Sequence, residues 1–461
     1  MSLTDAQTSS VLTALALLLL TAHALGHVFA HFRQPRVIGE ILGGLLLGPT
    51  LFGHLLPDLQ RAAFSSGDGV TYPVLGAVYQ LGLFLLMFCS GLEVRSGLRT
   101  GERRTALAVT IAGTAVPFAL GLAFLQLHGW TGYDLLDMSR FYGPAGNQTA
   151  FLLMFAIAVA VTSIPVISRI MFDLGILETS FARIVLGAAV IEDILLYVVL
   201  AIAIGMVAGP HGEVSGLLAL LGLEPSSAAA NVYHLVVPVA FIALALLLGP
   251  RLFRKASRFR YNLLAKGSPI AFLLVFMLVM AGLCVYLSIT PMFGAFIAGM
   301  IAGKGSEGPR SERAREAIKS FSFAFFVPVY FAIVGLKLDL IHAFEPAFFV
   351  FFLLFACGAK SLSVYAGARW AGESRHGARN LAVAMNARGG PGIVLASVAY
   401  DAAAISEGFY VILVMLAIVT SLLAGSWLER IVATGKPLNG SEASTVPQAP
   451  KPTVSPAHVM R

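Results

Sequence analysis

Long apolar stretches separated by short polar segments fill the chain from residue 10 to residue 430. A membrane-spanning helix needs about 20 predominantly apolar residues, and thirteen stretches reach or approach that length. They lie near residues 10–32, 36–52, 74–93, 104–128, 149–171, 181–208, 232–255, 268–287, 288–303, 316–335, 345–370, 378–400 and 405–430. The pattern predicts an all-α polytopic membrane protein with about thirteen transmembrane helices. We place the boundary between the eighth and the ninth at Ser288.

Composition supports the membrane class, since 57% of the 461 residues are hydrophobic and only 12% are charged. No basic residue precedes the first apolar stretch, so we expect it to be a retained span and not a cleaved signal. Beyond residue 435 the chain is rich in Pro, Ser, Thr and Ala. We therefore predict a membrane domain over residues 1–435 and a disordered cytoplasmic tail over residues 436–461.

The Lys and Arg residues are distributed unevenly between the two sides of the predicted bundle. Of the 31, the odd-numbered loops hold 22, while the even-numbered loops hold only Arg61, Arg140 and Lys337. Cytoplasmic loops collect positive charge, so we predict a multi-pass protein of the cell (inner) membrane with its N-terminus outside and its C-terminus in the cytoplasm. The net charge of +7 then reflects topology, and no nucleic-acid partner is expected.

Two acids stand side by side near the middle of an otherwise apolar segment, residues 181–204. They are Glu192 and Asp193. One acid at the centre of a span costs about 2.5–3.5 kcal/mol on insertion scales, so two require protons, cations or basic partners to offset the cost. One interpretation is permanent pairing with a buried Lys or Arg. The other, which we favour, is a site for a cation and a proton.

Two basic residues also lie within spans, Lys360 in the eleventh and Arg388 in the twelfth. At 1.5 Å per residue both lie roughly 15 Å from the cytoplasmic end of their helices, and Asp193 roughly 18 Å. The four ionisable groups therefore share one layer. Lys360 could be a snorkelling lysine, although ten residues is deep for that. For Arg388, whose guanidinium does not deprotonate, we favour a structural salt bridge.

The fifth and twelfth spans each contain a proline beside small or hydroxyl-bearing residues: Thr162, Ser163 and Pro165 in the fifth, and Gly389, Gly390 and Pro391 in the twelfth. A proline removes a hydrogen-bond donor, which frees the carbonyls of Val161 and Ala387. We predict that both helices break at the midplane, where unwound carbonyls can bind ions, although Pro165 alone would also fit a simple kink.

The chain also repeats itself. The second span reads GEILGGLLLG over residues 39–48 and the ninth reads GAFIAGMIAG over residues 294–303, with glycines at the same three offsets. The third and tenth spans end in Gly91-Leu92 and Gly335-Leu336, and the two proline-containing spans continue the series. Each pair is seven spans apart, and an odd offset inverts the second copy. This order predicts inverted repeats with the site at their interface.

The segments QPRVIGEILGGLLLGPTLFG, AVTSIPVISRIMFDLGILETSFARIVLGAAVIEDILLYVVL, SITPMFGAFIAG, FFVPVYFAIVGLKLD and MNARGGPGIVLA together resemble the monovalent cation:proton antiporter-2 family, whose membrane domain is sodium/proton exchanger-like. The resemblance implies a homodimer in which a core domain with two crossing discontinuous helices moves against a dimerisation domain. It implies that Asp193 carries the ion and that Lys360 is its basic partner. Thr162 and Ser163 would line one crossing helix, and Arg388 would lie in the other.

Glu192 departs from the family pattern, which has Asp, Asn or Gln before the aspartate. The resemblance suggests that an acid at this position accompanies electrogenic exchange, whereas Glu192 could instead reach Arg388 as a brace. We hypothesise that it sets the electrical character of the cycle without carrying the cation. The exchange would then be electrogenic, with Lys360 giving up or regaining a proton as Asp193 binds or loses its cation.

These features predict a secondary active antiporter that exchanges Na+ or K+ for protons by alternating access, with membrane lipid as its surroundings. A gated potassium efflux system on the same scaffold is the alternative, although the regulatory domain of that branch does not follow the spans. A symporter of a small organic acid and a non-transporting sensor are weaker alternatives. The sequence offers no nucleophile or metal constellation of an enzyme, and we expect no resident cofactor.

Overall fold

The computed structural model describes residues 3–32, 34–64, 70–93, 100–131, 138–177, 179–207, 217, 220, 228–259, 262–305 and 308–440. The later part of the predicted tail, together with Arg95 and Arg99 of the third loop, lies outside these residues. Within the described residues the chain is helical apart from turns, loops and an isolated bridge between Tyr142 and Ile405.

The helices of the first half of the chain are α1 (Asp5–His31), α2 (Arg36–Leu47), α3 (Phe52–Leu55), α4 (Pro57–Phe64), α5 (Thr71–Glu93), α6 (Thr100–Thr131), the 3-10 helix η1 (Met138–Phe141), α7 (Gln148–Ala160), α8 (Ile164–Asp173) and α9 (Ser180–Val207). Those of the second half are α11 (Ala228–Arg258), α12 (Leu263–Gly267), α13 (Pro269–Tyr286), α14 (Pro291–Gly305), α15 (Pro309–Phe321), the π-helix η2 (Ser322–Phe326), α16 (Val327–Leu336), α17 (Pro346–Trp370), α18 (Arg375–Ala384), α19 (Gly389–Asp401) and α20 (Glu407–Ala433).

The predicted class of membrane protein is confirmed. Eleven segments of the described residues are long and apolar enough to cross a membrane, and the shorter apolar helices α7 and α14 occupy the places of the fifth and ninth predicted spans. The boundary placed at Ser288 is also correct, because this residue has a left-handed φ of 57° between α13 and α14.

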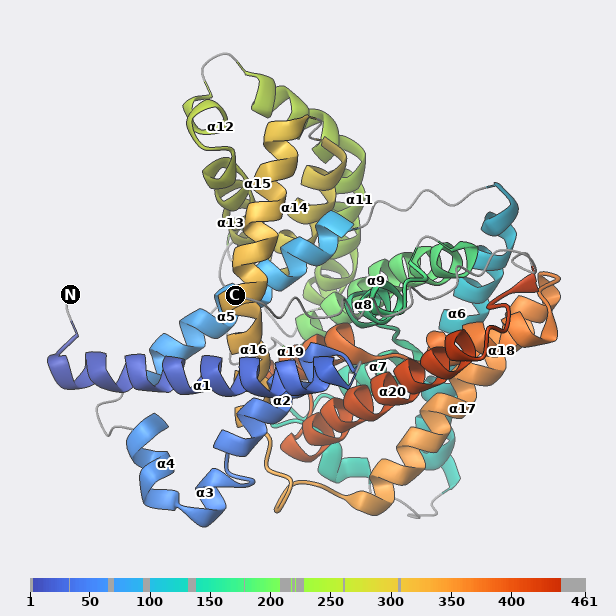
Figure 1. Cartoon of the computed structure of the whole chain (residues 1–461), viewed down its shortest axis with the longest axis horizontal. Coiled ribbons are helices and arrows are strands. Elements are labelled where there is room, and N and C mark those ends of the chain that lie inside the picture. The colour runs from blue at the N-terminus through green and yellow to red at the C-terminus, as the bar shows by residue number, and fades with distance from the viewer. Residues whose placement is uncertain are drawn as a thin grey trace, which may run out of the picture.

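The helices pack into two groups (Figure 1). We call α1–α5 and α11–α16 the glycine-contact group, and α6–α9 and α17–α20 the crossing-helix group. Extensive contacts between helices stay within each group, and the packing of α9 against α11 is the exception. Both groups draw helices from both halves of the chain, as an inverted repeat requires.

Close backbone contacts repeat in the two halves of the glycine-contact group. Gly44 of α2 lies against the carbonyl of Ala332 in α16, and its counterpart Gly299 of α14 lies against the carbonyl of Phe88 in α5. A Cβ atom at either glycine would overlap backbone atoms that cannot move independently. The glycines found by their spacing therefore set equivalent helix packings, which supports the predicted inverted repeats.

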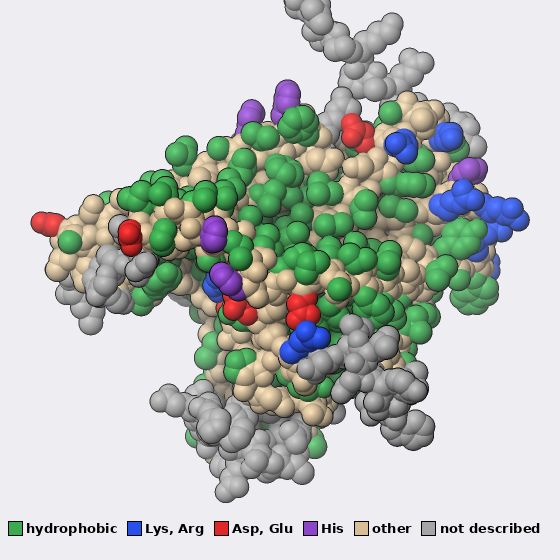
Figure 2. Space-filling model, turned by 90° about the horizontal axis from the view of Figure 1, so that it is seen from below, with side chains coloured by type: hydrophobic (Ala, Val, Ile, Leu, Met, Phe, Trp, Pro, Cys, Tyr) green, Lys and Arg blue, Asp and Glu red, His purple; other side chains and the backbone are tan. Residues whose placement is uncertain are grey.

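Figure 2 shows one face of the molecule, where hydrophobic side chains are spread across the described surface and Lys and Arg gather mainly at the right-hand edge. A surface of this kind suits contact with lipid acyl chains.

The segment after α20 packs against the crossing-helix group. The Asn439 amide donates to the Ser180 hydroxyl at 2.6 Å, and the Asn380 amide donates to the carbonyl of Leu438 at 3.0 Å. Leu438 and Asn439 are buried. The first residues of the predicted tail, 436–440, therefore extend the packed part of the chain.

Candidate ion-binding site

Two interrupted helices cross in the crossing-helix group. Residues 161–163 are non-helical between α7 and α8, and residues 385–388 are non-helical between α18 and α19. The two unwound segments bind each other, since the Ser163 N–H donates to the carbonyl of Ala387 and the Thr162 hydroxyl donates to that of Met385, both at 2.6 Å. The predicted breaks are present, and they lie against one another.

The breaks lie slightly before the positions expected from the prolines. Pro165, Gly389, Gly390 and Pro391 belong to the first turns of α8 and α19 and not to the unwound segments. The physical reason is that a proline in the first turn lacks only an N–H that would have no partner there. The Ser163 N–H occupies one of the two acceptor positions of the Ala387 carbonyl, so this carbonyl is only partly free for an ion.

Arg388 lies at the N-cap of α19 and is 1% exposed. Its guanidinium donates to the carbonyls of Ala158, Val159 and Ala356 at 3.0–3.2 Å, and to the Asn386 side chain at 3.2 Å. The first two carbonyls belong to the last turn of α7, where carbonyls have no partner within the helix. Arg388 thus braces the broken helix through carbonyls, in place of the carboxylate that the sequence led us to expect.

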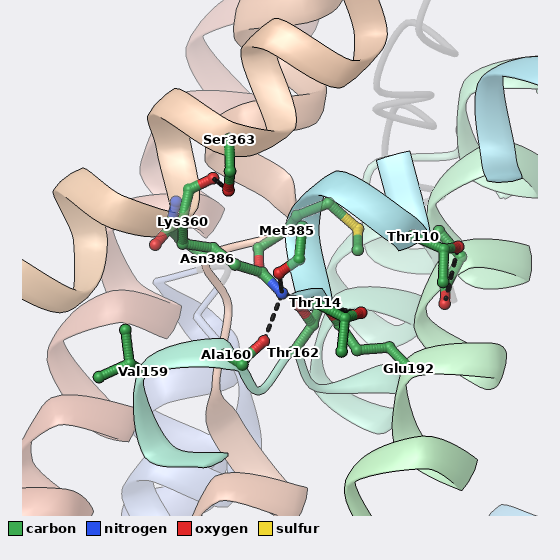
Figure 3. Close-up of polar contacts among 12 residues, drawn as sticks. Thr110, Thr114, Val159, Ala160, Thr162, Glu192, Lys360, Ser363, Met385 and Asn386 are labelled. Atoms are coloured by element: carbon green, nitrogen blue, oxygen red, sulfur yellow. Dashed lines mark hydrogen bonds and ion pairs between the residues drawn. The ribbon is translucent and has the colours of Figure 1, made fainter. Parts of the chain in front are cut away.

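Lys360 of α17 is completely buried and caps the same helix end (Figure 3). Its ammonium donates to the carbonyl of Gly113 at 2.9 Å, to the carbonyl of Ala160, the final residue of α7, and to Glu192 Oε1, with which it forms an ion pair. These contacts match the three donors of a lysine. Lys360, the basic partner expected for Asp193, therefore binds Glu192, the residue before Asp193 in the sequence.

Glu192 is buried and its Oε1 also accepts a hydrogen bond of 3.0 Å from Thr114 of α6. Sequence reasoning missed Thr114, although Thr110 and Thr114 fall one helical turn apart in an apolar span. The alternative contact between Glu192 and Arg388 does not occur in the described structure, because the guanidinium faces the end of α7.

Asp193 has different surroundings. Its side chain is 3% exposed, and no hydrogen-bond donor among the described residues reaches its buried Oδ1. Adjacent helical residues point about 100° apart, which explains why Lys360 contacts only one of the two acids. A buried carboxylate oxygen without a partner is costly, so it calls for a proton or a cation.

The hydroxyls expected beside the site are buried and partly engaged. Thr162 donates its proton to Met385 and keeps its oxygen lone pairs, whereas Ser163 Oγ accepts from the N–H of Val166 at 3.4 Å. Thr162 can therefore still serve as an oxygen ligand, which hard monovalent cations prefer.

Two crossing broken helices, buried cations at a half-helix end and an unpartnered buried carboxylate define a secondary ion transporter. The family model described as "Sodium/hydrogen exchanger, transmembrane" matches residues 14–434. The chain belongs to this family, which confirms the predicted membership of a monovalent cation:proton antiporter family.

Relatives agree with this assignment. The chain is 27% identical over 418 residues to the Na(+)/H(+) antiporter NhaS4 of Synechocystis, covering 89% of this chain and 94% of the relative. It is 29% identical to the K(+)/H(+) antiporter 1 of Saccharomyces cerevisiae, covering 88% of this chain and 44% of that protein. The chain likewise spans 47% of Cation/H(+) antiporter 18 of Arabidopsis thaliana, with 28% identity over 89% of its own length.

A solved structure has the same fold. The sodium proton antiporter MjNhaP1 of Methanocaldococcus jannaschii superposes with a TM-score of 0.60 at 16% identity, covering 92% of this chain and 98% of that one.

Proposed function

We propose that this protein is a secondary active antiporter in which Asp193 binds either a proton or one monovalent cation, Na+ or K+. The observation that carries the proposal is the contrast between two adjacent buried acids. Glu192 forms an ion pair with Lys360 through Oε1, whereas no basic side chain among the described residues pairs with Asp193, although each acid also keeps one buried oxygen without a hydrogen-bond partner, Oε2 of Glu192 and Oδ1 of Asp193. Of the pair, Asp193 is the acid available to a transported ion.

Coupling follows from the cost of moving charge. An empty, ionised Asp193 is a buried carboxylate with no basic partner among the described residues, and moving it through the apolar layer is expensive. A proton or a cation neutralises the carboxylate, so only the loaded site changes its exposure cheaply. Because the two ligands compete for the same oxygens, a gradient of one drives the other in the opposite direction.

The two helix groups supply the parts for alternating access. The crossing-helix group holds Asp193 and both breaks, and it is separable from the glycine-contact group because few extensive contacts join them. We propose that the crossing-helix group moves against the glycine-contact group, that the latter provides a homodimer contact, and that the protein resides in the cell membrane. The antiport activities named for the cyanobacterial and yeast relatives support this reading and leave both Na+ and K+ as substrates.

The test is transport in proteoliposomes with each alkali cation under an imposed proton gradient. We expect wild-type protein to exchange Na+ or K+ for protons and Asp193→Asn to fall to the rate of protein-free vesicles, since Asn keeps the volume but cannot ionise. Asp339→Asn is the matched control, because Asp339 lies in the loop after α16 and caps the backbone of Ile341 and His342. Wild-type rates in Asp193→Asn would contradict the assignment, and cation flux without proton movement would favour a gated efflux system.

A further inference from the structure

Three side chains form a polar cluster where the two helix groups meet. Lys337 is the C-cap of α16, Asp401 ends α19 and Tyr79 belongs to α5. The Lys337 ammonium lies 2.9 Å from Asp401 Oδ1, the Tyr79 hydroxyl donates to Asp401 Oδ2 at 3.0 Å, and the ammonium lies 4.3 Å from the centre of the Tyr79 ring. Both oxygens of Asp401 are thereby engaged.

The cluster connects the crossing-helix group with the glycine-contact group, and few other extensive contacts join these two groups. Asp401 belongs to the crossing-helix group, whereas Lys337 and Tyr79 belong to the glycine-contact group. The pairs Arg183–Glu102 and Arg140–Glu345, by contrast, lie within the crossing-helix group. Lys337 and Asp401 are each about one-third exposed, and such a pair alone contributes little to folding stability. Its position across the boundary suggests a role in motion.

A cavity of about 210 Å³ opens beside Asp401. Its walls come from both groups, with Gln80 and Phe84 of α5 and Pro291 of α14 on one side and Ile204 of α9 and Val398 of α19 on the other. Ile204 lies eleven residues beyond Asp193 on α9, a rise of about 16 Å. The cavity thus lies at the Asp401 end of the bundle, and Asp193 is not among the residues that line it.

Two buried side chains with hydroxyl groups, Tyr330 and Ser397, lie between the cavity and the ion-binding layer. Tyr330 of α16 is fully buried and stacks on Tyr79 with ring centres 5.0 Å apart, and Ser397 lies one turn before Asp401 on α19. The buried hydroxyls of Tyr330 and Ser397 interact with each other, and that of Tyr330 also with Tyr79, but neither forms a well-directed hydrogen bond among the described residues. Polar groups without well-directed hydrogen bonds suit a surface that becomes hydrated when the groups separate.

We infer that Lys337, Asp401 and Tyr79 form a latch that holds the two groups together at this end and must open before ions reach Asp193 from this side. The inference rests on the proposed function for its role in transport. The geometry of the latch itself does not depend on which ion is carried. An alternative role for Asp401 is cation recruitment in the cavity, and the test below separates the two.

The reporter is Ser397→Cys in a background without Cys89, Cys284 and Cys357, labelled by a membrane-impermeant thiol reagent added from the Lys337 side. Ser397 is 1% exposed, so labelling is slow while the latch is closed. We expect Asp401→Asn and Lys337→Met each to raise the labelling rate several-fold. The double exchange Asp401→Lys with Lys337→Asp restores the pair and returns the rate toward that of the unmodified latch.

The control is Glu345→Gln, which breaks the exposed Arg140–Glu345 pair of 3.2 Å within one group and should leave labelling unchanged. Labelling needs no transport, so the latch is tested even if the proposed exchange is not observed. Repeating the labelling in Asp193→Asn separates a failure of the latch from a failure of the proposed exchange. Unchanged labelling in both single variants overturns the latch. Labelling rates that change in opposite directions in the two single variants also overturn it and would assign Asp401 to cation recruitment. Fast labelling that persists in the double exchange overturns it as well.

Discussion

At the residue scale, the charge of the ion site follows from the contacts of two adjacent acids. Glu192 and Lys360 form a buried pair whose charges cancel, and Thr114 holds the same carboxylate oxygen. The remaining charges of the layer are the carboxylate of Asp193 and the fixed guanidinium of Arg388, which binds carbonyls at the end of α7. The site carries the same charge with one proton bound as with one cation bound, so exchanging one for the other moves no net charge across the membrane.

This arrangement predicts electroneutral exchange of one proton for one cation, which differs from the electrogenic cycle that the acid at position 192 suggests from the sequence. In proteoliposomes whose membrane potential is clamped with valinomycin and K+, the Na+-driven proton flux should be the same at zero and at negative potential. Asp193→Asn vesicles give the background. A flux that rises or falls steeply with potential would show that Lys360 loses its proton during the cycle, and that the Glu192–Lys360 pair is not permanent.

The layer of ionisable residues could be predicted from the sequence, but their pairing could not. Counting residues along a helix gives the depth of Asp193, Lys360 and Arg388, because the rise per residue is constant. It does not tell which neighbouring helix each side chain faces. In the structure, Lys360 contacts Glu192 and Arg388 contacts carbonyls of α7. Both contacts depend on how α7, α9, α17 and α19 pack against one another.

At the element scale, the end of α7 explains why two cations are buried in a membrane layer. The carbonyls of the last turn of a helix carry a partial negative charge. Arg388 binds those of Ala158 and Val159, and Lys360 binds that of Ala160. The last carbonyls of α7, which ends in the middle of the bundle, thereby accept hydrogen bonds from protein side chains. Both side chains are fixed beside the acids.

The element boundaries show where sequence reasoning succeeds. The glycine spacing and the two prolines predict which spans repeat and which are broken, because these residues act on their own backbone. The position of each break is set by tertiary contacts, such as the hydrogen bond from Ser163 to Ala387, which no local pattern contains.

The repeated glycine contacts give a matched prediction. Gly44→Ala and Gly299→Ala should each lower the melting temperature of the detergent-solubilised protein, because a Cβ at either position meets a backbone carbonyl and overpacking costs about 1–3 kcal/mol. The effects should be similar in size, since the two sites are equivalent in the repeats.

Gly282→Ala in α13 is the control for this pair. A Cβ at Gly282 meets no atom within 4 Å, and alanine is the better helix former by about 0.5–1 kcal/mol, so this change should be neutral or stabilising. Equal melting temperatures for all three variants would mean that the glycine contacts do not hold α2 against α16 and α14 against α5.

At the scale of the whole molecule, the ion site and one side of the latch belong to the same helix group. The crossing-helix group holds Asp193 in α9 and Asp401 at the end of α19, and residues of the glycine-contact group lie against Asp401. A movement of one group past the other changes the surroundings of the two carboxylates together. Which compartment the latch faces depends on the orientation of the protein in the membrane.

The orientation is the final prediction, and it follows from the basic residues. Arg251, Arg254, Lys255 and Arg258 are exposed at the end of α11, and such loops remain in the cytoplasm. Lys337 then lies outside, because α15–α16 crosses from its basic start at Arg310 and Arg313 to the opposite face. In a cysteine-free background, Ser9→Cys should react with an impermeant maleimide in intact cells, whereas Ser257→Cys should react only after permeabilisation. The reverse pattern would invert the topology and make the latch a cytoplasmic gate, leaving its residues unchanged but exchanging the side from which it admits ions.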